Sequence, residues 1–134
     1  MRGYLLDTNI LSDVIRNPDG AVARHIEKVG PKEIFTSLIV AAELRCGCAK
    51  KGSPKLLARV KGLLETIPVL PMDTPLDVEY GRIRSELEAA GQTIGMNDLL
   101  IASHASALGL TMVTDNTSEF SRIQGLSVEN WLRD

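Results

Sequence analysis

Short apolar segments that alternate with segments of helical periodicity are the feature that most constrains how this chain folds. Four segments have the length and composition of buried strands and a fifth is shorter; they cover residues 3–7, 33–36, 67–70, 110–114 and 126–128. The first four are separated by stretches with apolar residues at helical spacing. This alternation predicts an α/β domain with a mostly parallel sheet of four to five strands and helices on both faces.

Capping residues mark the expected ends of several helices. Ser37 is expected to cap a helix over residues 38–50, and Asp73 or Thr74 a long helix that ends before residue 91. Asn97 is a candidate cap for a further helix that ends at residue 108. Pro68 predicts that the third strand lies at an edge of the sheet, because proline cannot donate a hydrogen bond to a neighbouring strand.

The bulk composition predicts one domain over residues 1–134 in a reducing compartment. The chain is long enough to bury a core without disulfides, and Cys46 and Cys48 stand too close together to form a structural one. No apolar run reaches the roughly 18 to 20 residues of a membrane span, so we expect a cytoplasmic protein without membrane contact. The net charge of −2 argues against unspecific coating of nucleic acid.

Three carboxylates stand inside hydrophobic segments. Asp7 ends the first strand, Glu43 is surrounded by Ala and Leu, and Asp98 opens an apolar helix. Asp7 could simply cap the first helix, and Asp98 could offset a helix dipole, but Glu43 is costly to bury without a partner. Functional groups in such sheets gather at the carboxyl ends of the strands, so we expect the three acids to meet there.

A cluster of this kind favours a hard divalent cation. Two carboxylates about 4 Å apart repel by roughly 4 kcal/mol at an effective dielectric constant of about 20. No nearby segment offers an obvious buried Lys or Arg to neutralise three of them. Mg²⁺ or Mn²⁺ takes oxygen ligands and stabilises the charge that builds on phosphate oxygens. The site therefore predicts phosphoryl or phosphodiester chemistry.

Other catalytic arrangements fit the sequence poorly. The chain has no glycine-rich phosphate loop, and Asn9 stands where a haloacid-dehalogenase phosphatase needs a second aspartate. A triad of Asp98, Ser103 and His104 would lie on one short helix. Zinc binding by His104 and the two cysteines lacks a regular fourth ligand.

Four sequence blocks resemble the PIN-domain ribonucleases. The blocks are LLDTN at 5–9, TSLIVAAEL at 36–44, NDLLIA at 97–102 and VTDN at 113–116. The resemblance covers essentially the whole chain, and among PIN proteins the chain looks most like the VapC toxins of bacterial type II toxin–antitoxin pairs. It implies a PIN-like three-layer sandwich and Mg²⁺- or Mn²⁺-dependent endonucleolytic cleavage of RNA, with water as the nucleophile.

The resemblance also implies roles for individual residues. Asp7 and Asp98 match the acids that hold the metal ion, and Glu43 matches the acid that completes its coordination or orients the attacking water. Thr114 matches a small hydroxyl residue that supports the site. Asn9 is expected to hydrogen-bond a carboxylate or the substrate.

The fourth acidic position departs from the family pattern. Many members carry an acid two residues after the threonine, where this chain has Asn116. Asn116 itself, the adjacent Asp115 and the nearby Glu119 are the candidates for this position. The departure bears on whether a second metal ion binds.

Basic residues provide candidate RNA contacts. Residues 45–61 hold six Lys or Arg and no acid, a run that could equally be a solvated helical face. The candidates are Lys50, Lys51, Arg82 and Arg84. Arg84 is the foremost, because it lies on the long helix that precedes the third acid.

The resemblance further implies partners, with alternatives left open. A VapB-like antitoxin is expected to block the acidic pocket, within a larger assembly that contains a toxin homodimer and binds operator DNA only through the antitoxin. The expected substrate is a structured RNA such as a tRNA. The alternatives are a housekeeping PIN nuclease that acts in RNA maturation or on DNA, and a non-catalytic binding module that has kept only the fold.

Overall fold

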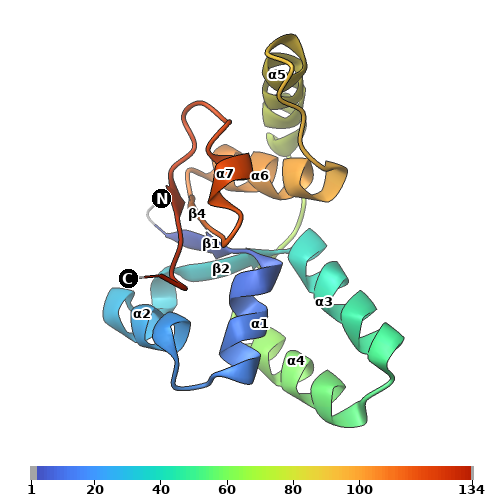
Figure 1. Cartoon of the computed structure of the whole chain (residues 1–134), viewed down its shortest axis with the longest axis vertical. Coiled ribbons are helices and arrows are strands. Elements are labelled where there is room, and N and C mark those ends of the chain that lie inside the picture. Colours follow the sequence, from blue (N-terminus) through green and yellow to red (C-terminus); the bar gives the residue numbers. More distant parts are fainter. Residues whose placement is uncertain (1–2, 134) are drawn as a thin grey trace.

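The computed structural model describes residues 3–133, which form a parallel sheet between two groups of helices (Figure 1). The sheet of these residues has five strands in the order β3-β2-β1-β4-β5, and each neighbouring pair is parallel. The strands are β1 (Tyr4–Leu6), β2 (Ile34–Ser37), β3 (Val69–Leu70), β4 (Thr111–Val113) and β5 (Val128–Glu129). The predicted α/β fold is confirmed; residues 1, 2 and 134 of the expected domain lie outside the described residues.

The order of the strands explains why helices cover both faces. The chain moves outward from β1 through β2 to β3, then returns across the sheet to β4 and β5. Right-handed crossovers place helices on opposite faces when the direction of travel reverses. Accordingly α1–α4 lie on one side of the sheet and α5–α7 on the other (Figure 1). The helices are α1 (Thr8–Arg16), α2 (Ala21–Val29), α3 (Leu38–Lys51), α4 (Pro54–Thr66), α5 (Leu76–Ala89), α6 (Met96–Leu108) and α7 (Thr117–Phe120).

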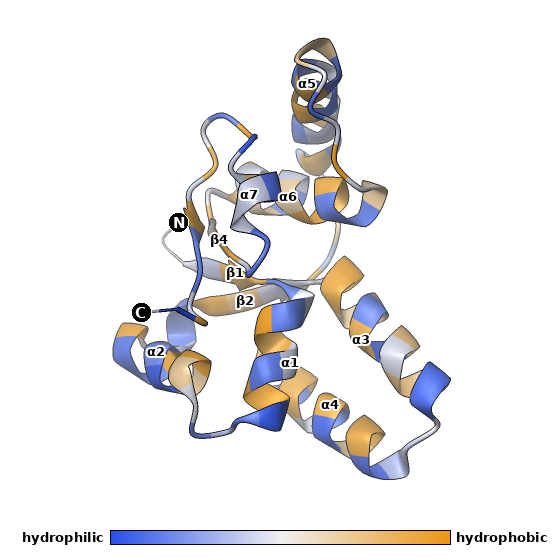
Figure 2. Ribbon diagram, in the orientation of Figure 1, coloured by the Kyte–Doolittle hydropathy of each residue, from blue (hydrophilic) through white to orange (hydrophobic). Residues whose placement is uncertain are grey.

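The core lies on both faces of the two central strands. Leu5 and Leu6 of β1 and Met112 and Val113 of β4 are completely buried. Both faces are covered by helices, so these strands are continuously apolar instead of alternating. Figure 2 shows hydrophobic residues along β1 and β2 and in interrupted stripes on the helices. No helix within residues 3–133 has the length and apolar character that crossing a bilayer requires.

Most predicted elements are present with shifted ends. The third strand lies at an edge of the sheet, as Pro68 indicated, but comprises only two residues. A short 3₁₀ helix over Pro31–Glu33 and the four-residue helix α7 were not predicted. Elements this short make only about one helical turn, so no apolar spacing is repeated in them and periodicity cannot reveal them.

The predicted cap of α5 is wrong. We expected Asp73 or Thr74 to cap this helix, but it begins at Leu76 after Pro75, without a side-chain cap. The helix begins one residue after Pro75, so neither Asp73 nor Thr74 occupies its N-cap position. The Leu76 amide instead donates to the Asp73 carbonyl in the preceding turn.

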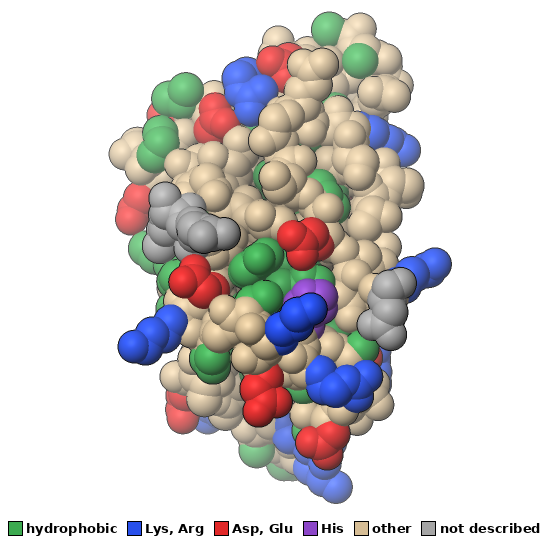
Figure 3. Space-filling model, turned by 90° about the vertical axis from the view of Figure 1, so that its left-hand side faces the viewer, with side chains coloured by type: hydrophobic (Ala, Val, Ile, Leu, Met, Phe, Trp, Pro, Cys, Tyr) green, Lys and Arg blue, Asp and Glu red, His purple; other side chains and the backbone are tan. Residues whose placement is uncertain are grey.

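The C-terminal segment is anchored by an aromatic cluster. Trp131 is 1% exposed, its ring stacks on His25 of α2 at 4.3 Å, and Tyr4 of β1 packs at 5.0 Å. Its indole nitrogen donates to Glu129. Figure 3 faces this side of the molecule and shows a histidine beside hydrophobic side chains, with acidic and basic side chains scattered around them. The cluster connects the last described residues to both β1 and α2.

Trp131→Ala should lower the free energy of unfolding by about 3 to 5 kcal/mol, because it leaves a large cavity between β1 and α2. Urea unfolding followed by circular dichroism measures the change. Val78→Ala is the matched control, since Val78 is 64% exposed. The free energy of unfolding of this variant should stay within about 0.5 kcal/mol of the wild-type value. Equal effects of the two substitutions would contradict the role given to Trp131.

Candidate active site

The candidate site lies where β1 and β4 end side by side. Strand order reverses here, and crevices at such points are the usual ligand sites of open α/β sheets. Asp7 follows β1 and Thr114 follows β4; the Thr114 hydroxyl donates to Asp7 Oδ2 at 2.8 Å. The Asp7 amide donates to the Val113 carbonyl at 2.9 Å, which extends the strand pairing to the acid itself. Asp7 is therefore fixed in both backbone and side chain.

Asp7 also caps α1. Its Oδ1 accepts a hydrogen bond from the Thr8 amide at 2.8 Å. Capping α1 is compatible with a role of Asp7 as a metal ligand. An ionised carboxylate has about four acceptor positions, so two remain after the Thr8 and Thr114 bonds.

Glu43 is held by two polar residues from two other helices. It lies half-buried on α3, accepts a hydrogen bond from the Thr8 hydroxyl of α1, and accepts another from Asn97 Nδ2 of α6 at 3.3 Å. These contacts account for the acid among apolar neighbours. The prediction that Asn97 caps α6 is wrong: the helix begins at Met96 after Gly95, so Asn97 lies within the first turn, where its side chain can reach Glu43.

Asp98 and Glu119 complete a cluster of four carboxylates. Asp98 lies in the first turn of α6, and Glu119 lies on α7. Glu119 Oε1 accepts from the Gly95 amide at 3.1 Å, and its second oxygen accepts from the Asn116 side chain. Glu119 is thereby placed close enough to influence the ionisation of both Asp7 and Asp98.

The carboxylates oppose one another's ionisation. Burial raises the pKa of Asp7; hydrogen bonds from Thr114 and Thr8 lower it, and the charges of Glu43 and Glu119 raise it further. Burial together with the charges of Asp7, Glu119 and Glu43 raises the pKa of Asp98 to about 6. The site thus holds more negative charge than its surroundings stabilise.

Of the three candidates for the fourth acidic position, Glu119 is the one whose charge acts on both Asp7 and Asp98. Asn116 donates its amide to the Thr114 hydroxyl at 3.0 Å and uses its side chain to hold Glu119. Asp115 is exposed and accepts from Asn130 at 3.0 Å, which turns it away from the cluster.

Asn9 supports the backbone of this loop. Its side-chain oxygen accepts from the Asp115 amide at 3.2 Å. The structure therefore pairs Asn9 with a main-chain group and shows no bond from it to a carboxylate among residues 3–133. The contact connects the start of α1 to the loop after β4.

The donor set fits a hard divalent cation, although the site is not preformed. Four carboxylates supply only oxygen ligands, the type that Mg²⁺ and Mn²⁺ prefer. Within residues 3–133, no three acidic, histidine or cysteine side chains already meet at metal-ligand distances. Glu43 and Glu119 are turned toward the donors named above. Binding would require these two side chains to turn inward, and it would relieve the repulsion that raises the pKa values of Asp7 and Asp98.

The two arginines expected to contact RNA are paired along their own helix. Arg82 forms ion pairs with Glu79 and Glu86, both at 3.1 Å. Arg84 pairs with Glu88 at 3.0 Å. The charge of each arginine is therefore partly neutralised by carboxylates of its own helix.

Lys50 and Lys51 are exposed in the last turn of α3. Within the described chain, neither forms an ion pair. Both are therefore open to an anionic ligand. Lys51 also lines a cavity that reaches Glu43.

Sequence reasoning missed the contributions of Thr8 and Asn97. Each stands next to a predicted acid, in the LLDTN and NDLLIA blocks, but each binds Glu43, which is 35 and 54 residues away respectively. Adjacency to Asp7 and Asp98 was a signal that these two residues lie in the site. The identity of their partner depends on how α1 and α6 cross α3.

Comparison with known proteins identifies the class to which this fold and site belong. The family model of the PIN domain matches residues 4–126. Ribonuclease VapC2 of Rickettsia felis is 38% identical over 130 residues, which cover 96% of this chain and 97% of that protein. The tRNA(fMet)-specific endonuclease VapC of Shigella flexneri is 36% identical over 132 residues, covering 98% of this chain and 99% of that protein.

A solved structure supports the same assignment. The crystal structure of VapBC2 from Rickettsia felis, bound to a DNA fragment from their promoter, contains a chain that matches with a TM-score of 0.88 and 38% identity. The match covers 98% of this chain and 99% of that chain. The chain belongs to the PIN-domain family and, within it, to the VapC ribonucleases.

Asp98→Asn should stabilise the metal-free protein at pH 7.5 but not at pH 4. The pKa of Asp98 is about 6 in the folded chain, above its ordinary value of 3.8, so the folded state holds this proton more tightly than the unfolded state. Stability is therefore lost as the pH rises from about 4 to 6, and it stays lost above that. Removing the charge should therefore raise the free energy of unfolding at pH 7.5 by at most about 3 kcal/mol.

Urea unfolding at the two pH values measures this effect, with Asp19→Asn as an exposed-aspartate control. The control should change stability little at either pH. Destabilisation by Asp98→Asn at pH 7.5, or an equal gain at both values, would show that Asp98 is not held in a repulsive environment.

Proposed function

We propose that this chain is a Mg²⁺- or Mn²⁺-dependent endoribonuclease toxin that cleaves phosphodiester bonds in structured RNA. The observation that carries the proposal is that Glu43 and Glu119 lie close enough for their charges to act on Asp7 and Asp98 beside the ends of β1 and β4, in a chain of the VapC ribonuclease family. A non-catalytic binding module would gain nothing from a group of carboxylates whose burial and charges raise the pKa of Asp7 and Asp98.

Asp7 and Asp98 would hold the ion, with Glu43 completing its coordination and Glu119 in the fourth acidic position. A divalent cation in such a site supplies a Lewis acid that lowers the pKa of water and offsets charge on phosphate oxygens. Thr114 and the Thr8 amide keep Asp7 oriented and favour its ionised form.

Glu43 is placed to orient the attacking water and to accept a proton from it. The Thr8 hydroxyl and Asn97 Nδ2 fix the direction of its carboxylate from two different helices. As the water oxygen bonds to phosphorus and the phosphodiester P–O bond breaks, Glu43 Oε would receive the proton of the water, and the leaving oxygen would take a proton from solvent. A general base works only within hydrogen-bond reach of the proton that it accepts, so the orientation of Glu43 is part of its proposed role.

A tRNA is the proposed substrate, and a VapB-like antitoxin the proposed partner. The Shigella flexneri relative is named for cleavage of tRNA(fMet), and the Rickettsia felis relative was crystallised as a VapBC2 complex on promoter DNA. By analogy, the antitoxin would block the carboxylate cluster and alone contact operator DNA, in an assembly that contains a toxin homodimer. The site of action would be the cytoplasm, where its RNA substrate is found.

Asp7→Asn should reduce cleavage of total tRNA in Mg²⁺ at least about 100-fold, because the substitution removes a charged ligand and leaves the shape of the side chain unchanged. Gel electrophoresis of the products measures cleavage, and circular dichroism verifies folding. Asp19→Asn, on an exposed turn, should cleave like wild type. Undiminished cleavage by a folded Asp7→Asn protein would remove Asp7 from the mechanism.

Glu119→Gln and Asp115→Asn together identify the fourth acid. Glu119→Gln should lower cleavage about 10- to 100-fold and weaken the response to Mn²⁺, since the charge of this carboxylate acts on both Asp7 and Asp98. Asp115→Asn should have little effect, since its side chain faces Asn130. The opposite ranking would assign the fourth position to Asp115.

A further inference from the structure

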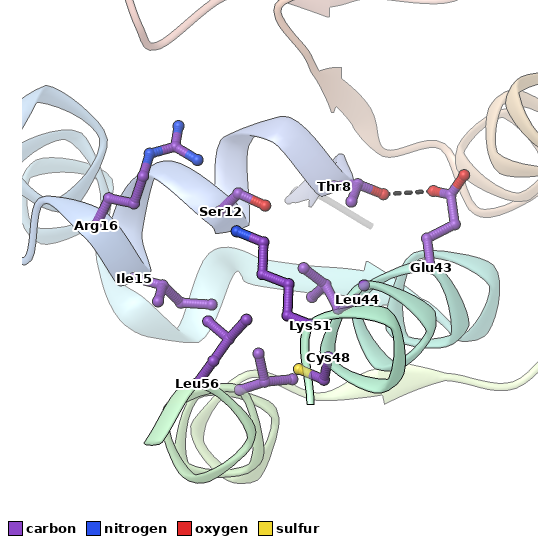
Figure 4. A pocket seen from close by; sticks show the side chains of 11 residues that line it. Thr8, Ser12, Ile15, Arg16, Glu43, Leu44, Cys48, Lys51 and Leu56 are labelled. Carbon is purple, nitrogen blue, oxygen red and sulfur yellow. Dashed lines mark hydrogen bonds between the residues drawn. The ribbon is translucent and has the colours of Figure 1, made fainter. Parts of the chain in front are cut away.

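A groove leads away from the carboxylate cluster between α1 and α3 (Figure 4). Its cavity measures about 240 Å³. Thr8 and Glu43 line it at one end, while Leu56 and Val60 of α4 form its apolar floor. Because two residues of the candidate active site belong to its wall, a ligand in the groove would adjoin the carboxylates directly.

The two helices present matched rows of side chains to this groove. In each row the residues are four apart and therefore share one face of their helix. The rows are Thr8, Ser12 and Arg16 on α1, and Glu43, Gly47 and Lys51 on α3. A rise of 1.5 Å per residue places the basic end of each row roughly 12 Å from the end at the active site. The groove thus runs from Thr8 and Glu43 beside the active site to the basic residues Arg16 and Lys51.

Both cations at the far end are available to a ligand. Among residues 3–133, neither Arg16 nor Lys51 forms an ion pair, in contrast with the paired arginines of α5. Figure 4 shows the Lys51 side chain extending across the cavity toward Ser12. Basic residues are common in the last turn of any helix, where they offset its dipole. The dipole does not explain why both of these cations line the same groove.

Gly47 keeps the α3 wall of the groove open. Glycine inside a helix costs about 0.8 to 1 kcal/mol relative to alanine. A Cβ atom built at Gly47 would meet nothing within 4 Å, so packing within the chain does not require a glycine. The same holds for Gly62 of α4 and Gly81 of α5, so Gly47 differs from them only in its place, where it leaves the wall of this groove open to a ligand.

We propose that this groove binds the RNA strand next to the scissile phosphate, with Arg16 and Lys51 holding one of its phosphate groups. The inference rests on the proposed ribonuclease function and extends it to the substrate path. A separation of roughly 12 Å corresponds to about three stacked nucleotides at 3.4 Å each. The cations would offset the repulsion between RNA and four carboxylates, and the open backbone at Gly47 would leave room for the strand.

The lining favours a polyanion over a protein segment. Among the described residues, Glu43 at the active site is the one acid that lines the groove, and Arg16 and Lys51 stand at the other ends of the two rows. The apolar floor of Leu56 and Val60 would suit a protein segment as well, so the experiment must separate the two occupants.

Arg16→Gln and Lys51→Gln should each raise the KM for total tRNA in Mg²⁺ about 10-fold and leave kcat within about twofold, because they act on binding and not on the reacting atoms. The slope of log(kcat/KM) against log salt concentration should become shallower by about 0.7 for each cation removed. Lys28→Gln on α2, an exposed lysine outside the groove, is the control and should change neither quantity.

Gly47→Ala separates binding from stability. The substitution should raise Tm by about 2 to 5 °C through its helix propensity, yet raise KM several-fold because the added methyl group obstructs the groove. Gly81→Ala on α5, where a Cβ also meets nothing, should raise Tm comparably without a change in KM.

Failure of the inference can be told from failure of the proposed function. Wild-type protein that leaves total tRNA intact in Mg²⁺ and in Mn²⁺ would overturn the proposed function and this inference with it. If the wild-type protein cleaves tRNA but Arg16→Gln and Lys51→Gln leave both KM and the salt slope unchanged, the inference alone is overturned. The groove would then be assigned to a protein partner.

Discussion

The hydrogen bond from the Thr114 hydroxyl to Asp7 joins the ends of two strands that are more than a hundred residues apart in sequence, and the site is organised around it. Parallel pairing of β1 with β4 brings the two residues together. The same carboxylate caps α1, which in turn carries Thr8 to Glu43. One buried aspartate therefore sets the relative positions of the sheet, the first helix and a second acid.

The carboxylate cluster around Asp7 lowers the stability of the metal-free fold. Burial and mutual repulsion raise the pKa of both Asp7 and Asp98, so the metal-free fold would be more stable without these charges. Natural sequences break the rules of folding mainly at functional sites, and the remainder of the core compensates. Here the compensation comes from completely buried strands and from the helices on both faces of the sheet.

Sequence patterns predicted the elements and the acids, but not the contacts between them. Asp7 was recognisable because a carboxylate ends an apolar strand, and Glu43 because it interrupts an apolar helix. The bond from Asn97 to Glu43 depends on how α6 crosses α3, which local periodicity does not encode. Glu119 could be named only as one candidate among three, because α7 is too short to show a pattern. The cap expected at Thr74 was wrong because the helix begins only after Pro75, which a short capping motif does not reveal.

Calorimetric titration of the metal-free protein with Mn²⁺ at pH 6, in buffers of different ionisation enthalpy, tests the central claim most directly. If a divalent cation neutralises the carboxylate cluster, binding should be saturable and should release roughly half a proton or more, because the pKa of Asp98 is about 6. Asp98→Asn should bind more weakly and release fewer protons. Absence of saturable binding, or binding with the same proton release in Asp98→Asn, would contradict the account.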